Sequence, residues 1–141
     1  MLDQDTILHA VGQGALGIEC RNDDKDVLEM LTVLNHKETW IRCTAERAFM
    51  RKLEGGCSVP LGVWTELQHD GSILLKGNVC SVDGSEEIMD EVRGQIDSTS
   101  RWDAQCSAAA RLGQFLAEKL IRRGASRILA SIRPSTALSG E

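Results

Sequence analysis

The chain has 141 residues, of which 42% are hydrophobic and 26% are charged, and this composition fits one globular domain, or one domain with a piece of another. Its formal net charge of −5 argues against non-specific nucleic-acid binding, because the sequence offers no basic face to neutralise phosphates. No run approaches the roughly 20 apolar residues of a membrane-spanning helix, and the first residues lack the basic and apolar regions of a signal peptide. We therefore expect a cytoplasmic protein that binds neither nucleic acid nor membrane.

The segment from Ile7 to Cys20 combines an apolar run, a glycine loop and a predicted short strand at its end. Gly12, Gly14 and Gly17 match the GxGxxG spacing of dinucleotide-binding loops. That fingerprint also needs a complete βαβ unit and an apolar helix that begins at the last glycine. Here Ile18–Arg21 leads into a polar turn, so the sequence argues against a nucleotide site.

Two helices are predicted next. The first runs from about Lys25 to Leu34, where apolar residues share one face and aspartates favour the N-terminal end. The second runs from about Lys37 to Leu53, with Asn35 or His36 as its cap and Glu38 placed as in a capping box. The residues that we expect on its buried face are Ile41, Ala45, Ala48, Phe49 and Leu53.

The charged residues of the second helix lie off this buried face. Arg42 and Glu46 are four residues apart, as in solvent-exposed ion pairs, so we expect a solvated surface. The alternative is that these charges face a neighbouring domain. We expect Trp40 and Cys43 to pack rather than react, since indoles and thiols are common in protein interiors.

After residue 60 the apolar pattern changes to a period of two. Strands are predicted at residues 61–67, 73–80 and about 87–96, with turns at Asp70–Gly71 and Asp83–Ser85, and this order indicates an antiparallel meander. A sheet this small needs a cover on at least one face. The fold class is therefore α/β in the segregated, α+β sense, with a small three-stranded antiparallel sheet packed against helices.

The predicted cover is a helix from about Ala104 to Arg123, which has the clearest helical period in the chain. Gly113 falls on its apolar face, where it weakens an isolated helix but lets a facing element approach closely. Residues 97–103 have no periodicity and are predicted to be a loop. Residues 126–132 form a last short apolar piece before a polar tail.

The stretch from Leu53 to Gly62 carries the strongest chemical signal. Gly55 and Gly56 precede Cys57 and leave the backbone without side chains, so a large group has room to approach or attach at the sulfur. A thiolate is a good carbon nucleophile, and a thioether is not hydrolysed as a thioester is, so this position suits permanent attachment. The alternatives are a small buried thiol beside a turn and a cysteine hydrolase.

The remaining cysteines and the histidines give no sign of further chemistry. The five cysteines are an odd number without a CxxC pair, so we expect reduced thiols rather than a zinc site or a complete disulfide framework. His9, His36 and His69 have no neighbours that mark a catalytic base or a metal ligand. We expect no bound metal.

Four motifs in order resemble hydroxymethylbilane synthase, also called porphobilinogen deaminase. They are Val11–Arg21 (VGQGALGIECR), Leu34–Thr39 (LNHKET), Thr44–Phe49 (TAERAF) and Leu53–Gly62 (LEGGCSVPLG). The Asp83–Ser85 turn and the closing helix before Gly124 also resemble this family. The resemblance extends over nearly the whole present chain, but it corresponds only to the C-terminal portion of the usual family chain.

The resemblance implies a cofactor and a reaction. Cys57 is expected to carry a dipyrromethane cofactor through a thioether, with Gly55 and Gly56 giving it room, and Gln13 is expected to approach the pyrrole chain. The family condenses four porphobilinogen units into hydroxymethylbilane, a precursor of haem, and keeps the cofactor on the enzyme. The family's catalytic aspartate and most of its carboxylate-binding cations belong to the first two domains, so no residue here is expected to be catalytic.

These implications lead to a specific expectation for the isolated chain. Porphobilinogen and its oligomers carry several carboxylates, whereas this chain is acidic, so we expect little synthase activity without complementary N-terminal domains. Glu46 and Arg47 are expected to join the C-terminal domain to its neighbours. The competing interpretation is a non-catalytic interaction module, or a truncated product, with the family's C-terminal fold.

The expected organisation has three parts. Residues 1–24 are a remnant of the preceding domain and hinge, residues 25–133 form the cofactor-anchoring domain, and residues 134–141 are a polar tail.

Overall fold

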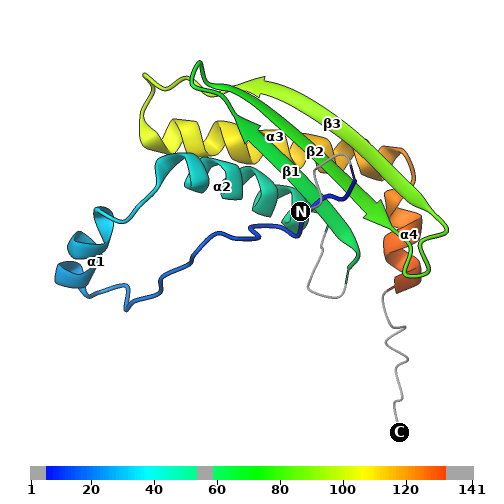
Figure 1. Cartoon of the computed structure of the whole chain (residues 1–141), viewed down its shortest axis with the longest axis horizontal. Coiled ribbons are helices and arrows are strands. Elements are labelled where there is room, and N and C mark those ends of the chain that lie inside the picture. The colour runs from blue at the N-terminus through cyan, green and yellow to red at the C-terminus, as the bar shows by residue number, and fades with distance from the viewer. Residues whose placement is uncertain (1–5, 54–58, 133–141) are drawn as a thin grey trace, which may run out of the picture.

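The computed structural model describes residues 6–53 and 59–132, and these form a three-stranded antiparallel sheet with two long helices on one face (Figure 1). The elements are α1 (Lys25–Thr32), α2 (Lys37–Lys52), β1 (Leu61–Leu67), β2 (Ser72–Cys80), β3 (Glu87–Gln95), α3 (Trp102–Arg122) and α4 (Ala125–Ile132). The strand order is β1-β2-β3, with both neighbouring pairs antiparallel. The expected fold class is confirmed. None of the helices in the described ranges has the length and apolar content needed to cross a membrane.

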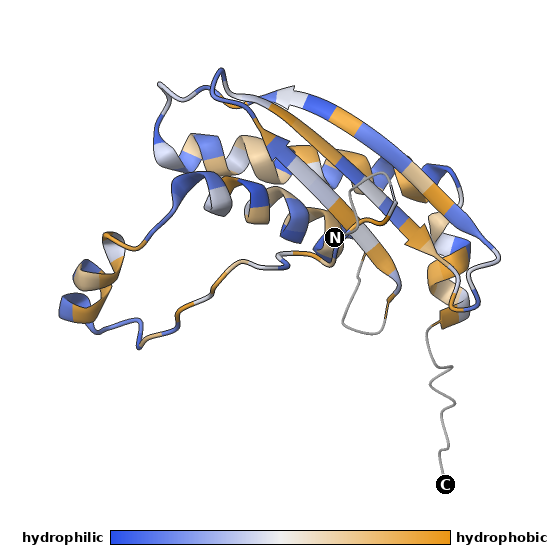
Figure 2. Cartoon of the chain, in the orientation of Figure 1, coloured by the Kyte–Doolittle hydropathy of each residue, from blue (hydrophilic) through white to orange (hydrophobic). Residues whose placement is uncertain are grey.

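The sheet follows from the alternating burial of its residues, and Figure 2 shows both polar and apolar positions along the strands. In β2 the buried positions are Ile73, Leu75, Gly77 and Val79, one residue in two, as a pleated strand with one covered face requires. The first turn depends on Gly71, whose φ of +83° favours glycine and where a Cβ would collide with the carbonyl oxygen of Ile96.

The core lies between this sheet face and the helices α2 and α3. All five residues that the sequence predicts on the buried face of α2 are at most 9% exposed, so that prediction is confirmed. The largest side chains with almost no exposed surface are Phe49, Leu53, Val63, Thr65, Leu75, Val79, Leu116 and Leu120. The core therefore draws on α2, α3 and two strands rather than on one local segment.

The crossing of α2 and α3 depends on Gly113. A Cβ at this position would collide with the carbonyl oxygen of Ala45 and lie 2.8 Å from the amide nitrogen of Phe49. The backbones of the two helices therefore approach each other more closely than any larger residue would permit, as the sequence predicts.

Helix α2 begins at Lys37 as predicted, whereas one detail of its cap and the start of α3 differ from the sequence prediction. The cap of α2 is His36, one of the two predicted residues, whose Nδ1 accepts a hydrogen bond from the backbone amide of Thr39 at 3.3 Å. Glu38 therefore occupies the second helical position, not the third, and the predicted capping box is wrong. Helix α3 begins at Trp102, two residues earlier than predicted, because that indole packs against the core and lies 6.4 Å from the ring of Trp40.

The strand predicted at the end of the segment 7–20 is wrong. Residues 15–21 have no regular secondary structure, because no other described strand lies alongside them to complete a hydrogen-bonded ladder. The chain instead forms one antiparallel bridge earlier, between His9 and Val63.

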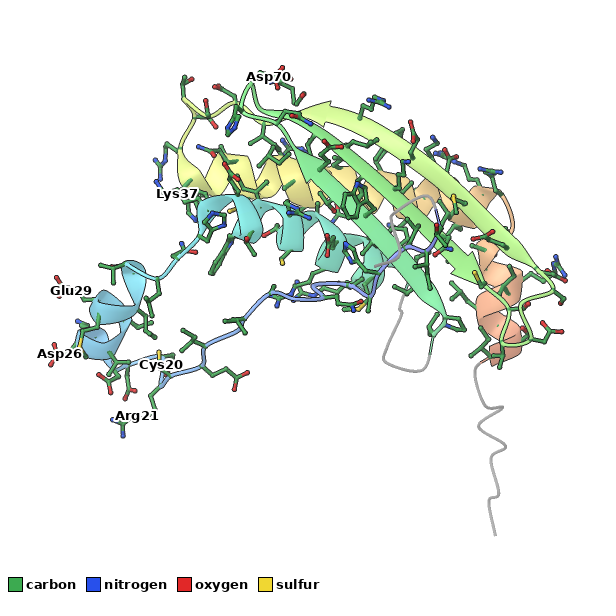
Figure 3. All side chains as sticks on the ribbon, viewed as in Figure 1. Cys20, Arg21, Asp26, Glu29, Lys37 and Asp70 are labelled. Carbon is green, nitrogen blue, oxygen red and sulfur yellow. The ribbon has the colours of Figure 1, made fainter. Side chains whose placement is uncertain are left out.

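Helix α1 stands apart from the sheet and its covering helices (Figure 1). None of its residues is buried, although Asp24 caps it by accepting a hydrogen bond from the amide of Val27 at 3.2 Å. Figure 3 shows the labelled Asp26 and Glu29 on this helix, with Cys20 and Arg21 on the chain that leads to it. We call residues 15–36 the α1 arm. Its exposed large apolar residues are Leu16, Ile18, Leu28, Met30, Val33 and Leu34.

Candidate functional site

The first described residues cross the edge of the sheet beside β1. We call residues 6–14 the N-terminal strap. His9 and Val63 exchange backbone hydrogen bonds, with N···O distances of 3.1 and 2.8 Å. The His9 ring also meets the Trp64 ring edge to face, with centroids 5.7 Å apart. These contacts attach the strap to the sheet at one defined register.

A glycine in β1 permits a second close contact of the strap. A Cβ at Gly62 would lie 2.7 Å from both the Cβ of Leu8 and the Oδ1 of Asn78, so only glycine fits without displacing them. The amide of Gly62 donates to that Oδ1 at 2.7 Å. The strap and this end of the sheet border a hollow of about 480 Å³.

The polar side of this hollow is acidic. The side-chain Nδ2 of Asn78 donates to Oε1 of Glu87 at 2.6 Å, and the Sγ of Cys80 lies 3.8 Å from the same oxygen. Burial, followed by the nearby Glu87 charge, raises the pKa of Cys80. The hollow therefore holds a protonated thiol at neutral pH and offers a poor environment for a carboxylate-rich ligand.

The prediction of a solvated charged face on α2 is wrong for Glu46, although Arg47 and Arg51 are exposed as predicted. Only 2% of the surface of Glu46 is exposed, and its two carboxylate oxygens accept hydrogen bonds from the Thr65 hydroxyl and the Gly12 amide, both at 2.8 Å. Among the described residues, Arg42 and Glu46 form no ion pair, and the Nε of Arg42 is buried without a hydrogen-bond partner. The carboxylate is buried because two donors from distant segments replace its water.

One sequence signal points to this buried carboxylate. Thr65 occupies an inward position in the alternation of β1, where an apolar residue is the usual choice. A hydroxyl at such a position needs a buried hydrogen-bond partner. The neighbouring helix supplies that partner through Glu46.

The structure places Gln13 in the turn of the N-terminal strap. The side-chain Oε1 of Gln13 accepts a hydrogen bond from the backbone amide of Ala10 at 3.0 Å. The backbone amide of Gln13 donates to the carbonyl oxygen of Ala10, also at 3.0 Å. Gly12 and Gly14, on either side, have φ values of +69° and +81° and no atoms close to where a Cβ would stand. The turn therefore has free space beside its two glycines, and the Oε1 of Gln13 faces the backbone amide of Ala10.

The three other predicted site residues, Gly55, Gly56 and Cys57, lie outside the described residues. Both flanks of their segment are described. Leu53, which is 2% exposed, ends α2 with its amide bonded to the carbonyl of Phe49. On the other side Val59 packs against the core.

The strap reaches the same core as the flanks of this segment. Val11, in the strap, and Val59 both pack against the hydrophobic core. The turn that contains Gln13 and both flanks of the 54–58 segment are therefore attached to one hydrophobic core. The distance between Gln13 and Cys57 is outside what is described.

The cysteines that the structure describes are free thiols. They are Cys20, which is exposed, Cys43, which is buried, and the half-buried Cys80 and Cys106. Burial is the first cause that raises the pKa of Cys43 and of Cys106, as it is for Cys80. These three thiols are therefore poor nucleophiles at neutral pH.

Most cations near the C-terminal helices already have carboxylate partners. Asp90 accepts hydrogen bonds from Lys119 at 2.8 Å and from Arg123 at 3.1 Å, and the first of these holds its pKa below the ordinary 3.8. By contrast, Arg47 and Arg51 are exposed on the last turns of α2 and take part in no ion pair among the described residues. They are the described cations nearest in sequence to the 54–58 segment that remain available to an anion.

Two family models match the chain. The model described as "Porphobilinogen deaminase, C-terminal domain" matches residues 40–122, and the model described as "Porphobilinogen deaminase, dipyromethane cofactor binding domain" matches residues 1–29. The first match includes most of α2, the whole sheet and α3, and the second includes the strap and the start of α1.

Curated relatives match over most of the chain. The porphobilinogen deaminase of Synechococcus sp. (strain RCC307) is 50% identical over 132 residues, which are 94% of this chain and 38% of the relative. That of Prochlorococcus marinus (strain MIT 9312) is 50% identical over 125 residues, 89% of this chain and 36% of the relative. That of Gloeobacter violaceus (strain ATCC 29082 / PCC 7421) is 48% identical over 132 residues, 94% and 37% respectively.

The chain thus spans well under half the length of the curated relatives it matches. Since the C-terminal domain model alone covers more than half of its residues, and three of the four ordered motifs lie within these matches, the chain belongs to the porphobilinogen deaminase family.

Proposed function

We propose that this chain is the cofactor-carrying C-terminal part of a hydroxymethylbilane synthase, which condenses four porphobilinogen units into hydroxymethylbilane in the cytoplasm. The observation that carries the proposal is the family match over residues 40–122, because this match includes the EGGC motif and the two elements that flank it. The match of residues 1–29 to the cofactor-binding domain model supports the same function.

Cys57 is the proposed attachment point of a dipyrromethane, through a thioether, with Gly55 and Gly56 leaving room beside it. When bound, the cofactor supplies the pyrrole carbon to which porphobilinogen is added. Attachment at this position is supported by the fixed flanks of the segment, where Leu53 and Val59 pack on the core. The raised pKa values of the three buried or half-buried thiols disfavour a competing attachment there.

The described residues fit such a group in part. Arg47 and Arg51 are exposed, lack carboxylate partners among the described residues, and precede the segment on α2, so they suit a carboxylate-bearing cofactor. Gln13 lies in the open glycine turn of the strap and is the proposed pyrrole-side contact. Lys119 and Arg123 are committed to Asp90 and do not contribute.

The proposed organisation keeps three parts: residues 1–24 as the end of the preceding domain, 25–133 as the cofactor-anchoring domain and 134–141 as a tail. The proposed partners are porphobilinogen, its oligomers and the N-terminal domains that the relatives carry, either in one chain with this part or as a separate polypeptide. The coverage of 36–38% of the relatives supports the need for these domains.

The function is tested by measuring hydroxymethylbilane formation. We expect the purified 141-residue chain to show no turnover. Co-production with the N-terminal region of the Synechococcus relative should give turnover that Cys57→Ser removes and that Cys20→Ser, at an exposed thiol, leaves unchanged. Robust turnover by the chain alone would contradict the proposed need for the N-terminal domains.

The competing function, a non-catalytic interaction module, is favoured by one observation. The α1 arm exposes six large apolar residues without a described partner surface. A module that uses this arm would bind the N-terminal region of the relative and leave Cys57 unmodified with no turnover. That outcome would replace the enzyme proposal.

A further inference from the structure

The buried carboxylate of Glu46 connects segments that are far apart in the sequence. Its Oε2 accepts from the amide of Gly12, 34 residues earlier, and its Oε1 accepts from the hydroxyl of Thr65, 19 residues later. Both distances are 2.8 Å, within the range of well-formed hydrogen bonds. With only 2% of its surface exposed, Glu46 has these two donors in place of water.

The alternative partners of this carboxylate do not form contacts with it. Arg42 lies one turn earlier on α2, and Arg47 follows Glu46 directly, yet neither forms an ion pair with it among the described residues. A buried charge without a compensating cation is retained only if its hydrogen bonds are satisfied. The position of Gly12 is therefore coupled to the Glu46 side chain through this hydrogen bond.

The two partners of Glu46 belong to different family matches. Gly12 lies within residues 1–29, which match the cofactor-binding domain model, whereas Glu46 and Thr65 lie within residues 40–122, which match the C-terminal domain model. We propose that Glu46 is a positioning residue that fixes the N-terminal strap, and with it the turn containing Gln13, on the C-terminal domain.

Two further contacts hold the earlier part of the strap, and Val11 packs against the core. The strap is attached to the sheet by the His9–Val63 bridge at the edge of β1 and by Leu8 against Gly62. Neither the bridge nor the Leu8 contact reaches the turn at residues 11–14. There, among the described residues, the hydrogen bond from the Gly12 backbone amide to Glu46 connects the turn to the rest of the domain. The role of Gln13 rests on the proposed function, but the joint itself does not.

The test is amide exchange in the 141-residue chain, followed residue by residue by NMR. In Glu46→Ala we expect the amides of Gly12 and Val63 to exchange at least about tenfold faster, because the strap opens locally. The amides of β2 and the middle of α3 should change less than about twofold. Glu118→Gln is the matched control, since the Glu118 side chain is 46% exposed and pairs with Lys52 at 3.1 Å.

The conservative variant separates positioning from simple stabilisation. Glu46→Gln keeps an oxygen for the Gly12 amide and gains an NH₂ that donates to Thr65, so exchange at Gly12 should stay within about threefold of the native chain. If Glu46→Ala fails to fold, Glu46→Asp carries the test, because its shorter side chain cannot reach both donors. The same local acceleration at Gly12 and Val63 is then expected.

Two results would overturn the inference. One is unchanged exchange at Gly12 in Glu46→Ala or Glu46→Asp. The other is uniform acceleration through β2 and α3, which would assign Glu46 a role in global stability only. Because none of these readouts needs the cofactor or turnover, failure here is distinguishable from failure of the proposed function.

Discussion

In α2, all five apolar residues that the helical period selects are buried, whereas α1 has no buried residue at all. Both helices are amphipathic by sequence, and both have a described cap, at His36 and Asp24. The difference lies in what surrounds them: α2 packs on α3 and the sheet, whereas nothing described covers α1. Amphipathicity therefore predicts that a helix has a face to bury, but not that the partner is present in the same stretch of chain.

The largest expected contrast between these regions comes from truncating one apolar side chain in each. Phe49→Ala should lower the free energy of unfolding by about 3–5 kcal/mol, because Phe49 has no exposed surface and its removal leaves a cavity. Leu28→Ala, in α1, should change it by less than about 0.5 kcal/mol, because Leu28 is already 42% exposed. Urea unfolding measures both. Similar losses would mean that the α1 arm packs as firmly as the core.

A smaller loss is expected from adding a single methyl group where the two long helices cross. Gly113→Ala should lower the free energy of unfolding by about 1–3 kcal/mol, although alanine favours helix, because its Cβ would collide with the carbonyl oxygen of Ala45. Ser107→Ala is the matched control in α3, where the side chain is exposed and the change should be neutral or slightly stabilising. Thermal unfolding compares the two, and a stabilised Gly113→Ala would contradict the close crossing.

The smallest effect concerns the surface pairing of β3 with α3. Lys119 and Arg123 lower the pKa of Asp90 in the folded chain, so the stabilisation that its carboxylate provides is complete above the unfolded pKa and is lost as pH falls through the folded pKa. Asp90→Asn should therefore cost about 1 kcal/mol or less at pH 7. The gap to the native chain should shrink as the pH falls below the ordinary 3.8.

The control for this pH dependence is Asp103→Asn, since Asp103 forms an exposed pair with Arg101. Stability curves measured from pH 7 to pH 2.5 should show a much smaller gap for this variant. A gap for Asp90→Asn that is independent of pH would show that its charge is not the source of the effect.

Most of the fold could be predicted from local patterns. Local residue types were enough to predict the alternating burial in β1 and β2, the two turns between the strands and the helical period around Gly113. The errors occur where the structure of a residue depends on a partner that is distant in the sequence. The strand predicted near Ile18 lacks a neighbouring strand, and Glu38 forms no capping box because His36, rather than Asn35, is the cap of α2.

The site was less predictable for the same reason. Glu46 is four residues after Arg42, which favours an exposed ion pair by local rules, yet its partners are Gly12 and Thr65. The resemblance to the family identified Cys57, Gly55, Gly56 and Gln13 by motif alone. Of these, the structure describes only Gln13, so the anchoring role of Cys57 stays a prediction.

The most direct test of that role is intact mass measurement with peptide mapping, after co-production with the N-terminal region of the Synechococcus relative. We expect a pair of linked pyrroles on the peptide that contains Cys57, and no such addition in Cys57→Ser. An unmodified Cys57 in a complex that forms hydroxymethylbilane, or attachment at another cysteine such as Cys20, would contradict this role.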